Sequence, residues 1–220
     1  TTTFETTGNP GYVRDTQEIR VNFSINEVGS TLEGNPSVTI GGNNADEVTG
    51  TYPSYTARYS FKGAETQGAI NYTIDAQDTV GNSMIPVTGA TGIIYDRTPP
   101  TVAISTTDGK TAGRSGDAIR FTATFTETNE IQSTPEPRIT ITGIAANAEM
   151  TESDNKTWYY DATIAGGDYN AAVTVTAFDA AGNPVGTHSG VTEFTVDNTP
   201  PSVSSVSFSH ATGTTLKIGD

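Results

Sequence analysis

The chain has 220 residues, with 25 Asp and Glu against 11 Lys and Arg, and a formal net charge of −14. This charge opposes the phosphate backbone of nucleic acids and anionic membrane surfaces, so neither is an expected partner. The absence of Cys excludes disulfides and thiolate metal sites, and no run of 18 apolar residues exists to span a bilayer. No basic start followed by an apolar core marks a signal peptide, so we expect a mature piece or a fragment.

An internal repeat organises the chain from its first residue. Positions 1–19 align without a gap on 101–119, and Arg14 and Ile19 match Arg114 and Ile119. Segment 36–40 then meets 137–141, the string Asp-x-x-Gly-Asn recurs at 78–82 and 179–183, and Asp-x-Thr-Pro-Pro recurs at 96–100 and 197–201. The sequence therefore predicts one repeat over 1–100, a second over 101–201, and the first strand of a truncated third over 202–220.

Each repeat is predicted to be an antiparallel β-sandwich of immunoglobulin type, and the fold class all-β. The chain contains 40 Thr, and about seven short β segments per repeat alternate with Gly, Asn, Asp and Pro clusters. Alternation gives the expected core, to which the single Trp is added: Ile19, Val21, Phe23, Ile25, Tyr72, Ile74, Ala76, Ile93, Tyr95, Ile119, Phe121, Phe125, Trp158, Val173, Val175, Ala177, Phe194 and Val196.

The paired strings carry a resemblance. Asp-x-x-Gly-Asn followed about 14 residues later by Asp-x-Thr-Pro-Pro resembles the bacterial immunoglobulin-like (BIg-type) repeats of giant surface adhesins, biofilm-associated proteins and some surface-layer proteins. The linker strings are similar to the acidic, Pro-containing linkers of cadherins, which bind calcium. The resemblance covers residues 1–201 and implies an extracellular stalk or extender role at the cell surface.

Acidic residues are expected to converge between the repeats. Glu127 ends the second strand of repeat two and Asp179 its sixth, so both should approach the linker residue Asp96. Because little Lys or Arg lies nearby, a hard cation with oxygen ligands would neutralise them. The hypothesis is a Ca²⁺ site at Asp96, Glu127, Asp179 and Asn183, with equivalent half-sites toward further repeats at Glu27, Asp78 and Asp197.

Two alternatives stay open at this stage. Asp78 and Asp179 could instead accept hydrogen bonds from their own turn backbones while the linker acids are solvated. The chain could also be a self-assembling subunit of a surface layer or filament, because Val203, Val206 and Phe208 form an apolar strand that could be donated to a neighbour. The expected partners are thus neighbouring repeats of the same chain and, in the alternative, copies of itself.

Enzymatic activity is not expected. Paired carboxylates can serve acid–base catalysis, but here the same pairs recur in both repeats, which favours a structural role over a single active site. Three Asn-x-Ser/Thr strings, at Asn22, Asn71 and Asn155, match the glycosylation pattern, although such matches are frequent in a Thr-rich chain.

Overall fold

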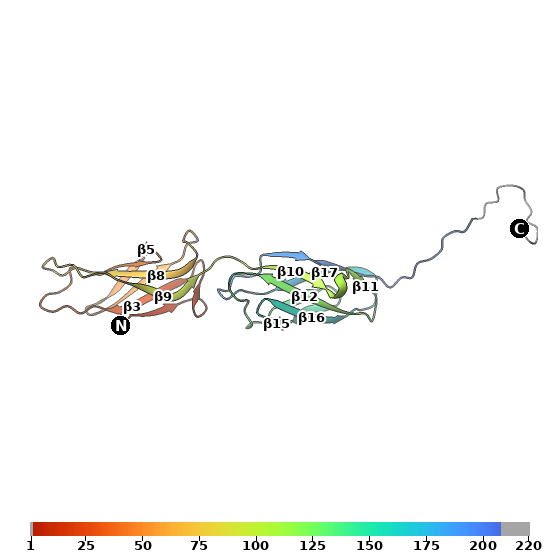
Figure 1. Cartoon of the computed structure of the whole chain (residues 1–220), viewed down its shortest axis with the longest axis horizontal. Coiled ribbons are helices and arrows are strands. Elements are labelled where there is room, and N and C mark those ends of the chain that lie inside the picture. The colour runs from red at the N-terminus through yellow and green to blue at the C-terminus, as the bar shows by residue number, and fades with distance from the viewer. Residues whose placement is uncertain (1, 208–220) are drawn as a thin grey trace, which may run out of the picture.

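The computed structural model describes residues 2–207 of the chain and contains four antiparallel-rich β-sheets, two in each half (Figure 1). In the first half, one sheet has the order β1-β3-β7-β6 and the other β2-β9-β8-β4-β5. Its strands are β1 (Thr2–Thr6), β2 (Tyr12–Val13), β3 (Glu18–Ser24), β4 (Ser37–Ile40), β5 (Asn43–Asn44), β6 (Glu47–Thr51), β7 (Ser54–Ser60), β8 (Gly68–Asp75) and β9 (Val87–Tyr95).

The second half repeats this plan. Its sheets have the orders β15-β16-β12-β10-β18 and β11-β19-β17-β13-β14. The elements are β10 (Thr101–Thr106), a 3-10 turn (Thr107–Gly109), β11 (Ala112–Gly113), β12 (Ala118–Thr126), β13 (Arg138–Ile141), β14 (Ala145–Glu149), β15 (Thr151–Asp154), β16 (Thr157–Thr163), β17 (Tyr169–Thr176), β18 (Thr187–Gly190) and β19 (Glu193–Val196). We call the two halves the first and the second sandwich.

Each sandwich has its own apolar core between its two sheets. Period-two alternation directs one face of every long strand inward, so β3 buries Ile19, Val21 and Phe23. The second core contains Trp158, as predicted, and stacks Phe121 edge-on against Phe194 with ring centroids 5.4 Å apart. The all-β prediction is confirmed. Of the expected core residues, only Ile25, Tyr72 and Ala76 are merely half-buried.

Within residues 2–207 the first sandwich has nine strands and the second ten, more than the expected seven, and one reason is that the first strand of each repeat is split. β1 pairs with β3, whereas β2 pairs in parallel with β9 in the opposite sheet, and β10 and β11 divide between sheets in the same way. The interruption of the first strand contains Gly8, Pro10 and Gly11, residues that break regular pairing. This switch also places the 7–11 loop at the end of the first sandwich that faces the second.

The sandwiches follow one another end to end, and residues 201–207 lead away from the second one (Figure 1). Residues 202–207, the described part of the predicted third repeat, form no strand, and Val203 and Val206 are exposed. Phe208 and the rest of that predicted strand lie outside the described residues. In the part of the chain that is described, no helix is long and apolar enough to cross a membrane.

Candidate metal centre at the junction

Both Asp-x-x-Gly-Asn turns are built around their first Asp. Oδ1 of Asp179 accepts the backbone N–H of Asn183 at 2.8 Å, and Oδ2 accepts Nδ2–H of the same Asn at 2.9 Å. Asp78 and Asn82 make the same two bonds at 2.8 and 2.9 Å. Gly81 and Gly182 adopt φ angles of 92° and 89°, as the predicted tight turn requires. Asp78 and Asp179 therefore do accept hydrogen bonds from the backbones of their own turns, which was the alternative to a metal-binding role.

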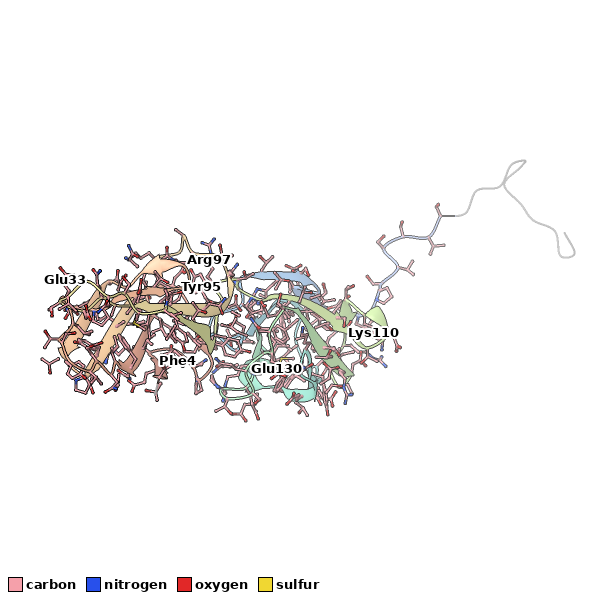
Figure 2. All side chains as sticks on the ribbon, turned by 60° about the vertical axis from the view of Figure 1, so that its left-hand side comes forward. Phe4, Glu33, Tyr95, Arg97, Lys110 and Glu130 are labelled. Carbon is pink, nitrogen blue, oxygen red and sulfur yellow. The ribbon has the colours of Figure 1, made fainter. Side chains whose placement is uncertain are left out.

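The linker residue Asp96 is held by the second sandwich. It directly follows β9, and its Oδ1 accepts the backbone N–H of Thr98 at 2.9 Å. Its Oδ2 accepts Nδ2–H of Asn129 at 2.5 Å, and its carbonyl accepts Nδ2–H of Asn183 at 3.1 Å. Asp96 is 5% exposed, so this linker acid is buried rather than solvated. Figure 2 shows the neighbouring Tyr95 and Arg97 near the boundary between the sandwiches.

Two oxygens from different sandwiches thus converge on one amide group. Asp179 Oδ2 and the carbonyl of Asp96 both receive Nδ2–H of Asn183, and the exposed fractions of Asp179 and Asn183 are 0% and 5%. Rotating the amide by 180° would present its oxygen at the same place. In the orientation observed, the amide of Asn183 links the two oxygens by hydrogen bonds. After rotation, its oxygen would lie beside them as a third oxygen ligand.

Glu127 lies beside this cluster and is half-buried. It directly follows β12, and its Oε1 accepts the backbone N–H groups of Thr128 and Asn129. Lys156 donates to the carbonyl of Glu127, not to its carboxylate. Within residues 2–207, no three Asp, Glu or His side chains are close enough together to hold a metal ion by themselves. A metal centre at the junction would therefore also need amide or backbone oxygens.

The three acidic residues at the junction, Asp96, Glu127 and Asp179, are not paired with basic side chains in the described part of the chain. Burial raises the pKa of the Asp179 carboxyl above its ordinary value, and the charges of Asp96 and Glu127 raise it further, against the lowering effect of the hydrogen bonds from Asn183. Among the described residues, no Lys or Arg forms a salt bridge with any of these three carboxylates. A cation bound here would relieve the repulsion.

The remaining predicted ligands lie at the two ends of the pair of sandwiches. At one end, the Ser30 hydroxyl is shared by Glu27 Oε1 at 3.1 Å and Asp78 Oδ2 at 3.2 Å. Hydrogen bonds from Asn82, followed by those from Val80 and Ser30, lower the pKa of Asp78. At the other end, Asp197 accepts the backbone N–H of Thr199 at 3.0 Å and is exposed. The structure brings neither group into contact with a second sandwich.

Three residues at the junction were not predicted from the sequence: Asn9, Arg14 and Asn129. Asn129 and Asn9 correspond to Gly29 and Gly109 in the other repeat, so comparing the repeats could not have identified them. Arg14 did offer a signal, because it recurs as Arg114.

No protein-family model and no curated protein matches the sequence. Among solved structures, the chain is similar to fibronectin(III)-like modules of Clostridium thermocellum CbhA, with 17% identity, 89% of this chain and 92% of that chain covered, and a TM-score of 0.39. It is also similar to a Ca²⁺-stabilised, ice-binding adhesin of an Antarctic bacterium, with 16% identity, 88% of this chain covered and a TM-score of 0.41.

A third similar structure is a tetra-tandem repeat from the extending region of a large adhesion protein, with 18% identity, 89% of this chain covered and a TM-score of 0.33. The chain spans 47% of the length of each of the two adhesin structures. At these identities the likeness concerns the fold.

Proposed function

We propose that the chain is a structural spacer: a segment of tandem immunoglobulin-like sandwiches in an extracellular, adhesin-like protein of the cell surface, stiffened by Ca²⁺ bound at the junction. The observation that carries the proposal is the meeting of Asp96, from the first repeat, with the fully buried Asp179 of the second on the amide of Asn183. A stalk needs its joints to resist bending, and this cluster lies at the joint.

The donor set suits calcium. Ca²⁺ takes 6–8 oxygen ligands from carboxylates, amide and backbone carbonyls and water. The junction offers the carboxylate of Asp179, the carboxylate and carbonyl of Asp96, the amide oxygen of Asn183 after rotation, and Glu127 after release from its own turn. Bound calcium would supply the direct positive partner that these carboxylates do not receive from a described Lys or Arg, and its ligands would come from both sandwiches.

The linker itself already restricts the joint. Pro99 and Pro100 fix two backbone φ angles and favour an extended path for the chain. Pro100 is buried, and its carbonyl accepts the backbone N–H of Gly186 at 2.9 Å. The linker therefore already limits how the two sandwiches can be oriented, and a bound cation would restrict the bending that remains.

The test compares small-angle X-ray scattering and thermal melting in millimolar calcium and in EDTA, using the matched variants Asp96→Asn and Asp197→Asn. The two Asp residues occupy the same motif, but only Asp96 contacts a second sandwich. We expect calcium to raise the melting temperature and narrow the distance distribution of the wild type and of Asp197→Asn, but not of Asp96→Asn. Equal responses of all three proteins would overturn the proposal, and growth in mass with calcium would favour a self-assembling subunit.

A further inference from the structure

A second set of contacts joins the sandwiches and contains no acidic side chain. Asn9 lies in the loop between β1 and β2, and its Nδ2–H donates to the carbonyl of Ala180 at 2.9 Å. Arg14 directly follows β2, and its Nε lies 3.6 Å from the point where a Cβ on Gly182 would stand. Both side chains therefore rest on the Asp-x-x-Gly-Asn turn of the following repeat.

The two copies of this turn show how much of it the first sandwich covers. Val80, at the third position of the turn in the first repeat, is 73% exposed, whereas its counterpart Ala181 is 1% exposed. The Asn that ends the turn shows the same difference in exposure: Asn82 is exposed, whereas Asn183 is buried. Because the two turns share the hydrogen bonds between their Asp and Asn residues, the difference in exposure marks an interaction surface on the second sandwich.

Arg14 packs on this surface through its side chain. Its Nε is buried and makes no hydrogen bond within residues 2–207. The Arg14 side chain lies against the turn that begins with Asp179. A Cβ at position 182 would be in ordinary van der Waals contact with Arg14 Nε and Asn9 Nδ2, so both side chains lie directly over Gly182.

The same Arg recurs at the far end of the second sandwich. Arg114 occupies the position of Arg14, but its side chain is 80% exposed and only 3.8 Å from Asp117 in an i,i+3 ion pair. In the described part of the chain no turn covers it. It therefore provides a control residue of the same type and local setting that lacks the interdomain contact.

We propose that Asn9 and Arg14 form a latch that docks onto the 180–182 turn of the next repeat and holds the joint in one orientation without metal. The partner it recognises is an Asp-x-x-Gly-Asn turn with a small third residue, as in Ala181. This inference goes beyond the calcium-stiffened spacer, because the latch acts whether or not a cation binds.

The test measures the orientation of the sandwiches directly. The chain has no Cys, so Thr49→Cys in β6 and Ser153→Cys in β15, both exposed, accept one spin label in each sandwich. Electron–electron distance distributions are recorded in EDTA for this background and for the same background with Asn9→Ala plus Arg14→Ala, or with Arg114→Ala. Urea unfolding of each protein confirms that both sandwiches remain folded.

In EDTA we expect a narrow distribution for the background and for Arg114→Ala, and loss of the narrow component when Asn9 and Arg14 are replaced. A background already broad in EDTA, or a double variant as narrow as the background, would overturn the latch. Adding calcium tests the spacer proposal separately: if calcium binds, it restores part of the narrow component in the double variant. If the double variant broadens the distribution and calcium has no effect, the latch proposal is supported and the calcium proposal is refuted.

Discussion

The two Asn residues that close the repeated turns form a matched pair for mutation. Asn183 donates from Nδ2 to Asp179 Oδ2 at 2.9 Å and to the carbonyl of Asp96 at 3.1 Å, and its side chain is buried. Asn82 donates from Nδ2 only to Asp78 Oδ2, at 2.9 Å, and is exposed. Asn183→Ala therefore removes one bond to a buried carboxylate and one bond across the junction, whereas Asn82→Ala removes a single bond that water can replace.

The size of the effect follows from these contacts. A hydrogen bond to a charged group contributes about 1.5–3 kcal/mol and one between neutral groups about 0.5–1.5 kcal/mol, so Asn183→Ala should destabilise the second sandwich by roughly 2–4 kcal/mol. For a domain of about 100 residues, each kcal/mol lowers the melting temperature by roughly 4–8 °C. The variant should therefore melt at least about 8 °C below the wild type, and Asn82→Ala should change the first sandwich far less.

The single Trp makes this measurable in the intact chain. Trp158 is buried in the core of the second sandwich, so its fluorescence during urea unfolding in EDTA reports that sandwich alone. Near-ultraviolet circular dichroism reports both sandwiches, because Tyr residues lie in each half, so for Asn82→Ala the first sandwich is followed by the part of that transition that the Trp158 fluorescence does not show. A loss below about 1 kcal/mol for Asn183→Ala, the value of one ordinary hydrogen bond, would refute the reasoning that both acceptors hold this side chain.

Three further outcomes are expected. The pKa of Asp179 is raised in the folded state, so protonation of this residue favours folding. In EDTA the wild type should therefore gain stability relative to Asp179→Asn as pH falls from neutral toward 3.8. Urea unfolding measured across this pH range would contradict the prediction if the slope were opposite. Phe121→Ala should cost the second sandwich about 3–5 kcal/mol by Trp fluorescence, because the ring is fully buried. Arg120→Ala, which breaks a two-bond pair with Asp161 on the sheet surface, should have a small effect that disappears in high salt; an effect independent of salt would point to packing on Tyr159 instead.

Alternation and the repeat predict the cores well, because burial in a sandwich depends mainly on which face of a strand a residue occupies. Ile19, Val21 and Phe23 follow that rule in the first repeat and Phe121 and Phe125 in the second. The rule weakens where strands end: Ile25 lies beyond β3 and is only half-buried. The division of the first strand between two sheets depends on pairing with a strand some 80 residues away, which local patterns do not specify.

The junction is predictable only where its residues recur. Asp96, Asp179 and Asn183 stand in repeated strings, and all three meet in the structure. Glu127 was expected to approach the same cluster, but its Oε1 accepts N–H groups of its own turn. The alternation of residues along a strand does not predict such a hydrogen bond within the turn that follows it. The place of Glu127 beside the cluster is nevertheless close enough to raise the pKa of Asp179.

The stiffness of this joint depends on how many separate segments attach one sandwich to the other. The peptide linker is one attachment, and Asp96 adds a second through Asn129 and Asn183. Both belong to the same short stretch of chain, so alone they leave bending about that stretch. Asn9 comes from a different loop of the first sandwich and contacts Ala180, which opposes such bending. If the latch acts, the joint should keep one preferred orientation after chelation, and calcium should only narrow the motion further. If it does not act, chelation should leave the linker and the hydrogen bonds of Asp96 as the remaining attachments.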